Sequence, residues 1–87
     1  NIILFKSEMS KHTNIQWLPS DSPIQSIIFP GNEKVKAIAN SLQQQGFDVR
    51  PILSPTVPKG QERIRICLHT FNTKEEVIKL ASVIGQL

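Results

Sequence analysis

The chain has one cysteine, no tyrosine, one tryptophan and four phenylalanines among its 87 residues. The single cysteine, Cys67, excludes an internal disulfide and is typical of a reducing compartment, so we expect a cytoplasmic location. Aromatic side chains that could stack on bases are scarce, which argues against a nucleic-acid surface. No apolar run approaches the ~20 residues of a membrane span, and no signal-peptide pattern opens the chain.

Concentrated charge is also missing. Ten basic and seven acidic residues give a net charge of +3, but the lysines and arginines are scattered along the chain. A nucleic-acid-binding domain usually gathers them on one face. A stand-alone basic module that binds RNA or a small ligand is therefore only the alternative hypothesis.

The length allows one small domain with one modest core, because a chain of this size buries roughly 60–65% of its unfolded surface. It begins with Asn1 inside an apolar run, and we expect it to be a piece of a longer protein. Residues 1–21 are expected to form a truncated helix and a loop, and residues 22–87 one α/β body.

Three stretches have the periodicity of amphipathic helices. The first is residues 1–12. The second follows Asn32, whose side chain we expect to cap it, and ends at Gly46, which suits a left-handed C-terminal cap. The third opens with a capping box of Thr73 and Glu76. The expected buried stripes are Ile2, Phe5 and Met9, then Val35, Ile38, Ala39 and Leu42, then Val77, Leu80, Ala81, Ile84 and Leu87.

Strands are predicted at residues 24–29, 47–53 and 62–69, and residues 14–23 read as a loop. Pro51 cannot donate to a ladder, so its strand should lie at an edge or a bulge. The order α-β-α-β-β-α predicts an α+β fold, an α/β two-layer sandwich. It would be a small, largely antiparallel three-stranded sheet with helices packed on one face and the other face open.

Alternation along the last strand separates apolar from basic side chains. Arg65 lies in the middle of the basic set and would point to the open face. It is either a solvated strand arginine paired with a neighbouring carboxylate, or an anchor for a ligand carboxylate, which a guanidinium matches with two parallel hydrogen bonds. Arg63 has the same two interpretations. One face would carry Ile64, Ile66 and Leu68, and the other Arg63, Arg65 and Cys67.

Thr56 follows Pro55 and precedes Pro58, so its backbone should be stiff. Its hydroxyl could contact a ligand or make a hydrogen bond that stabilises the loop. The glycine and lysine of residues 58–61 lack the spacing of a phosphate-binding loop.

No catalytic or metal site is expected within the chain. His12 and His69 are far apart, without other ligands at metal-binding spacing. Cys67 has no recognisable base nearby in sequence, so we expect it to pack rather than to act as a nucleophile. The chain by itself is expected to be inactive.

Three segments, "SPIQSIIFPGN", "SLQQQGFDVRPILSPTVPKGQERIRICL" and "NTKEEVIKLASVI", resemble the C-terminal domain of the α-oxoamine synthases. These are pyridoxal-phosphate enzymes of aminotransferase fold type I. The resemblance runs from about Ser22 to Leu87, and its most specific part extends from Pro55 to Arg65. Many relatives carry a histidine where this chain has Asn72, for which a role at the start of the last helix suffices.

The resemblance implies a function. Such enzymes join an amino acid to an acyl-CoA with loss of carbon dioxide, and the cofactor is the electron sink. The resemblance assigns binding of the amino-acid carboxylate to Arg65 and a substrate contact to Thr56. The lysine that attaches pyridoxal phosphate would lie in an upstream large domain, and the active site at a homodimer interface.

Within the family, the match favours L-alanine and pimeloyl-CoA, or a pimeloyl-carrier thioester, as the substrates, in biotin synthesis. Relatives that join glycine to acetyl-CoA or succinyl-CoA, or serine to palmitoyl-CoA, remain open alternatives. No nucleic-acid or membrane partner is expected.

Overall fold

The computed structural model describes residues 2–13, 15–18 and 20–87. Expectations that fall on Asn1, Asn14 and Pro19 lie outside these residues. No helix in the described ranges is long and apolar enough to cross a membrane. The elements are α1 (Ile2–Met9), β1 (Gln16–Leu18), β2 (Ile24–Ile28), α2 (Asn32–Gln44), β3 (Val49–Ile52), β4 (Arg63–Cys67) and α3 (Lys74–Gly85).

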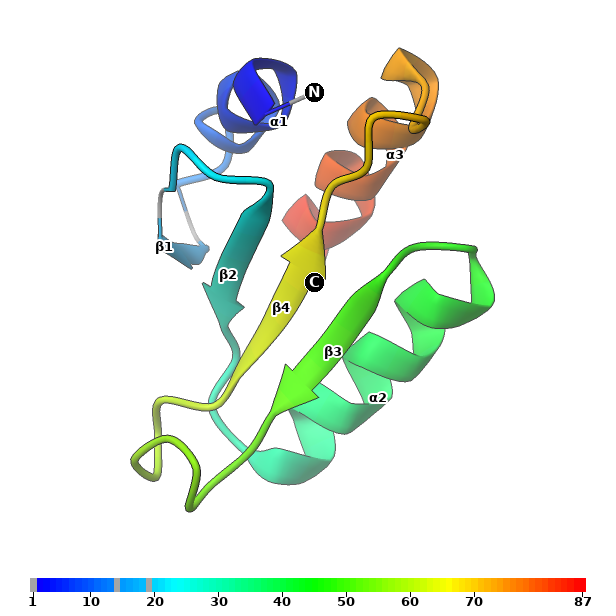
Figure 1. Ribbon diagram of the computed structural model, residues 1–87. Helices are drawn as coiled ribbons and strands as arrows, with labels where there is room; N and C mark the ends of the chain where they lie inside the picture. The colour runs from blue at the N-terminus through cyan, green and yellow to red at the C-terminus, as the bar shows by residue number, and fades with distance from the viewer. Residues whose placement is uncertain (1, 14, 19) are drawn as a thin grey trace.

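The strands form one antiparallel sheet in the order β1-β2-β4-β3 (Figure 1). Strand β4 is central, and Ile64 lies opposite Ile27 on β2 and Pro51 on β3. Strand β3 is an edge strand, as predicted from Pro51. The α+β class and the antiparallel sheet are confirmed.

The predicted number of three strands is wrong, because β1 forms within the expected loop of residues 14–23. Three residues are too few to show an alternating pattern, and only pairing with β2 makes them a strand. Trp17 lies opposite Ile27 and meets the ring of Phe5 edge-on, with 6.4 Å between the ring centroids. Strand β1 is thereby joined to the core.

A buried glutamine holds the turn between β1 and β2. The Gln25 side chain is fully buried. Its Oε1 accepts from Trp17 Nε1 (3.1 Å), and its Nε2 donates to the carbonyls of Ser20 (2.7 Å) and Ser22 (2.8 Å). Each polar group of the amide therefore has a partner, which offsets the cost of its burial.

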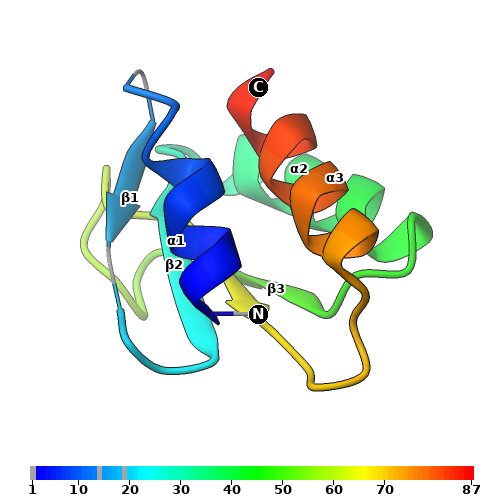
Figure 2. The same ribbon diagram turned by 90° about the horizontal axis from the view of Figure 1, so that it is seen from above.

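The three helices cover one face of the sheet, as predicted, with α1 beside α3 (Figure 2). The side chains between the helices and the sheet form a single core. The opposite side, here called the open face, carries Ser26 and Ile28 of β2, Arg50 and Ile52 of β3, and Arg63, Arg65 and Cys67 of β4. The buried core residues are Phe5, Met9, Ile27, Phe29, Val35, Ile38, Ala39, Leu42, Val49, Ile64, Ile66, Leu68, Val77, Leu80, Ala81 and Ile84.

The N-terminus of α2 differs from the prediction. Gly31, with φ of 108°, is the N-cap, and no side chain caps the helix. The Asn32 side chain instead accepts from the Ser54 N–H (3.0 Å) and donates to the Ser54 carbonyl (3.4 Å). Asn32 is in the first turn of α2, and its side-chain amide forms hydrogen bonds with the backbone of a distant loop rather than with its own helix.

The C-terminus of α2 agrees with the prediction. Gly46 adopts φ of 92°, a conformation that favours glycine. Its N–H donates to the Gln43 carbonyl (3.0 Å), and the Phe47 N–H donates to the Leu42 carbonyl (3.1 Å). These are the two hydrogen bonds of a Schellman motif.

The capping box of α3 is confirmed. Thr73 Oγ1 accepts from the Glu76 N–H (3.1 Å), and the Glu76 carboxylate accepts from the Thr73 N–H (2.7 Å). The expected buried stripe is also confirmed, except for Leu87, which is 49% exposed. The helix ends at Gly85, so Leu87 no longer follows the helical face.

Candidate functional site

Arg65 lies at the centre of the open face. It is exposed, while Ile64 and Ile66 on either side of it are buried, as the alternation predicted. In the register of the sheet it stands between Ser26 on β2 and Arg50 on β3.

The arginines that surround Arg65 are already engaged. Arg63 Nε donates to the Gln61 carbonyl (3.0 Å), and Arg50 Nε lies 3.9 Å from Asp48 Oδ1. The guanidinium of Arg65 itself makes no hydrogen bond or ion pair with any of the described residues. The carboxylate that would make Arg65 a structural residue is therefore not found in the described ranges.

The charges of Arg65 and Arg50 oppose one another directly across the β3–β4 pair. Like charges at opposed positions of a sheet are destabilising. A bound carboxylate would relieve this repulsion, so the arrangement favours an anionic ligand on the open face.

Thr56 is exposed in the loop that connects β3 to β4. The loop is fastened at its start by Asn32 and by the Val57 N–H, which donates to the Leu53 carbonyl (3.1 Å). Thr56 and Arg65 thus belong to one hairpin. No hydrogen bond joins them in the part of the chain that the structure describes.

Glu62 fastens the other end of the loop, and sequence analysis missed it. Its side chain is 3% exposed, and Oε1 accepts from the N–H groups of Gly31 (3.1 Å) and Gly60 (2.9 Å). These backbone donors hold the pKa of the Glu62 carboxyl below its usual value, and the Gly31 N–H has the largest effect. One carboxylate therefore ties the N-terminus of α2 to the loop that carries Thr56.

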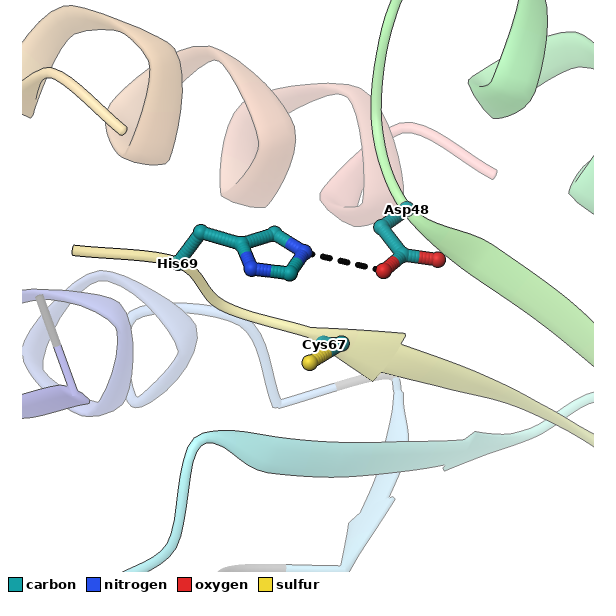
Figure 3. A group of neighbouring side chains, drawn as sticks. All are labelled: Asp48, Cys67 and His69. Carbon is teal, nitrogen blue, oxygen red and sulfur yellow. Dashed lines mark hydrogen bonds and ion pairs between the residues drawn. The ribbon is translucent and has the colours of Figure 1, made fainter. Parts of the chain in front are cut away.

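A second group of side chains lies at the other end of β4. Asp48, Cys67 and His69 each present a ligand-type atom, and these three atoms lie within 4.8 Å of one another (Figure 3). His69 Nε2 is 2.9 Å from Asp48 Oδ2. His69 therefore has two potential metal ligands beside it, and the prediction that it has none is wrong. The Cys67–His69 spacing was visible in the sequence, but the third member required the register of β3.

Asn72 shapes the turn that follows this group. Its Oδ1 accepts from the His69 N–H (2.8 Å) immediately before α3. This bond lies in the turn between β4 and α3, whereas Thr73 and Glu76 cap the helix itself.

The arginine site is an open surface. A hollow of about 610 Å³ lies elsewhere, between α1 and the residues that follow β4, and neither Arg65 nor Thr56 lines it. Lys6 borders this hollow and is paired with Asp21.

Pyridoxal phosphate, which the resemblance implies, requires a lysine for covalent attachment and groups that tune its ring. None of the described strand residues on the open face is a lysine. Lys6, at the hollow, is held by Asp21. The described strand residues of the open face therefore lack the lysine that this cofactor requires.

Comparison with known proteins agrees with the resemblance. The chain is 42% identical over 72 residues to an 8-amino-7-oxononanoate synthase of Azoarcus sp. (strain BH72), covering 83% of this chain and 18% of the relative. It is 50% identical over 50 residues to one of Emericella nidulans (58% and 12%). It is 35% identical over 84 residues to one of Stenotrophomonas maltophilia (97% and 20%).

The chain thus spans about a fifth or less of the length of these curated relatives. The family model for aminotransferase class I and II matches residues 1–84, which is nearly the whole chain. The chain therefore belongs to the aminotransferase class I and II family.

Proposed function

We propose that this chain is the C-terminal domain of an 8-amino-7-oxononanoate synthase. The whole protein would condense L-alanine with pimeloyl-CoA, or with a pimeloyl-carrier thioester, and release carbon dioxide and the free thiol. The family membership and the names of the relatives support this assignment. The observation that carries it is Arg65, exposed on the open face and without a partner among the described residues.

Arg65 would hold the carboxylate of the amino acid. A guanidinium gives two parallel hydrogen bonds, which fix the plane of the carboxylate as well as its position. Loss of that carboxylate as carbon dioxide requires the breaking bond to be held in one orientation. Positioning of this kind contributes several kcal/mol to lowering a barrier, on the order of the effective-molarity gains seen in intramolecular reactions.

Arg50 would support Arg65 by its charge. It stands opposite Arg65 in the sheet, and its own ion pair with Asp48 is loose, at 3.9 Å. The positive potential of the two guanidiniums favours the anionic form of an approaching amino acid.

Thr56 would contact the substrate from the loop. Its backbone is held between two anchors, the Asn32 side chain at Ser54 and the Glu62 carboxylate at Gly60. A hydroxyl on a fixed loop needs little ordering when a ligand binds.

Pyridoxal phosphate, bound by residues outside this chain, would supply the electron sink for the reaction. The homodimer and the cytoplasmic location implied by the resemblance belong to the same proposal. Within it, this chain binds and orients the amino acid and does not carry the covalent chemistry.

The test is an assay of thiol release by the full-length protein loaded with pyridoxal phosphate. Wild type, Arg65→Lys, Arg65→Ala and Arg63→Lys would be compared with pimeloyl-CoA and L-alanine. Arg63→Lys is the matched control, because Arg63 lies on the same strand and face but is bonded to the Gln61 carbonyl. We expect alanine-dependent release that falls at least a hundredfold in both Arg65 variants, and by less than threefold in the control.

Other outcomes separate the alternatives. Release with glycine and a short acyl-CoA in place of alanine and pimeloyl-CoA would assign the protein to a sister synthase. Unchanged release in Arg65→Ala would refute the role of Arg65 while leaving the reaction intact. Absence of cofactor absorbance and of release with every pair would favour the basic binding module.

A further inference from the structure

We propose that Asp48, Cys67 and His69 form a binding site for a divalent transition-metal ion, with Zn²⁺ as the preferred ion and one coordination position left open. The three side chains come from the residue just before β3, the end of β4 and the segment that follows β4 (Figure 3).

The sheet brings these side chains together. The Cys67 N–H donates to the Asp48 carbonyl (3.0 Å), so the two residues are neighbours across the β3–β4 pair. Side chains at such positions have Cβ atoms about 4.5–5.5 Å apart. His69 lies two residues beyond Cys67, and alternation brings it to the same side.

The donor set suits zinc. A thiolate, an imidazole and a carboxylate are the three ligand types that bind Zn²⁺, at about 2.0–2.3 Å from the ion. Tetrahedral coordination at these lengths places the ligand atoms roughly 3.5 Å apart. The atoms here lie within 4.8 Å of one another, and the Asp48–His69 pair is at 2.9 Å. Small side-chain rotations therefore complete the geometry.

Neighbouring groups orient two of the ligands. Phe71 stacks on the His69 ring, with centroids 4.8 Å apart and planes 7° apart. Arg50 Nε lies near Asp48 Oδ1, whereas His69 Nε2 contacts Oδ2. The Arg50 charge thus faces the oxygen that His69 does not contact, and a metal would replace the hydrogen bond between Oδ2 and Nε2. Fixing ligands in this manner raises metal affinity.

The site is distinct from the proposed contact at Arg65, although both lie on the same side of β4. Cys67 is the next residue on that side after Arg65. Metal binding at Cys67 does not depend on whether Arg65 holds an amino acid, so the two proposals succeed or fail separately.

The test uses Co²⁺ as a spectroscopic substitute for Zn²⁺ in the purified protein. Bonding between a thiolate and Co²⁺ gives a near-ultraviolet charge-transfer band. We expect wild type to develop this band and Zn²⁺ to abolish it by displacement. Cys67→Ser should lose the band, and His69→Gln and Asp48→Asn should weaken binding at least tenfold, because loss of an outer-shell partner already costs about 10–100-fold and loss of a ligand should cost no less. The matched control is His12→Gln, since His12 lies outside the cluster, and it should bind as wild type does.

A second measurement needs no variant. Zn²⁺ should slow alkylation of Cys67 at least tenfold, as followed by mass spectrometry of the peptide that contains it. A protein whose Cys67 is alkylated at the same rate with and without Zn²⁺ contradicts the proposal. Co²⁺ binding that persists unchanged in both Cys67→Ser and His69→Gln contradicts it as well.

Discussion

At the scale of single residues, the polar side chains around the β3–β4 loop and on the open face are of two kinds. Glu62 and Asn32 have their hydrogen-bonding capacity directed to backbone groups of the loop between β3 and β4. The guanidinium of Arg65 makes no hydrogen bond or ion pair with the described residues. Glu62 and Asn32 thus fix the conformation of the loop, whereas the Arg65 guanidinium has its donors left over for other groups.

Glu62 makes the stability of the domain depend on pH. Its folded-state pKa is lowered, so its contribution is present above the unfolded value of about 4.3 and is lost as the pH falls through the folded value. We expect Glu62→Gln to lower Tm at pH 7 by on the order of 5 °C. The difference from wild type should shrink below about pH 4.

Thermal unfolding followed by circular dichroism between pH 3 and pH 7 checks this. The matched control is Glu33→Gln, which removes an exposed carboxylate of α2 whose ion pair with Lys36 spans 3.9 Å. It should change Tm by less than 1–2 °C, as an exposed ion pair does. A constant difference between Glu62→Gln and wild type over the whole pH range would contradict the role of the ionised carboxylate.

At the scale of elements, α3 depends on its N-terminal cap. Thr73→Ala removes the acceptor for the Glu76 N–H and breaks one half of the capping box. We expect a loss of about 1 kcal/mol in the free energy of unfolding. Urea denaturation measures it, with Thr70→Ala, an exposed residue ahead of the helix, as the control. Equal stability of the two variants would show that the cap contributes nothing.

The C-terminus of α2 gives a second test at this scale. A Cβ at Gly46 would meet no atom within 4 Å, so any cost of Gly46→Ala comes from the backbone at φ of 92°. We expect this variant to lose about 1–2 kcal/mol of stability. Urea denaturation gives the value. A gain in stability, as for alanine at an unstrained position, would contradict the left-handed geometry.

Sequence patterns predicted what depends on local periodicity. The three helices, three of the four strands and the outward direction of Arg65 follow from spacing alone. Strand β1 was missed because pairing with β2, not its own pattern, makes it a strand. The capping of α2 by Asn32 was predicted wrongly because a competing partner, the Ser54 backbone, lies 22 residues away.

The group of Asp48, Cys67 and His69 was predictable only in part, because it too depends on pairing between distant segments. Alternation along β4 indicates that Cys67 and His69 share a side. Asp48 joins them only through the β3–β4 register, which no local pattern specifies. No sequence pattern indicated that Glu62 is buried, because a lone glutamate between a loop and a strand is ordinarily solvated.

At the scale of the whole molecule, α1 is part of the core rather than an appendage. Phe5 is fully buried and Met9 nearly so. The domain is small, so its total stability is modest, and a single core cavity removes a large fraction of it. The helix α1 therefore contributes to the stability of the fold.

Phe5→Ala tests this directly. We expect a loss of about 3–5 kcal/mol in the free energy of unfolding, typical of a buried phenylalanine. Urea denaturation followed by circular dichroism measures the loss. Ile3→Ala on the same helix is the control, because Ile3 is 84% exposed, and it should cost less than about 0.5 kcal/mol. A comparable loss in both variants would show that burial of Phe5 is not the cause.

The contacts of Trp17 with Phe5 and Gln25 also make this residue an intrinsic fluorescence probe of the folded domain. Trp17 is the only tryptophan, and the chain has no tyrosine, so its ultraviolet emission arises from one indole. That indole donates to Gln25 and meets the Phe5 ring, so it senses the turn before β2 and the seating of α1 at once. A shift of its emission towards longer wavelength signals the release of either segment, without any attached dye.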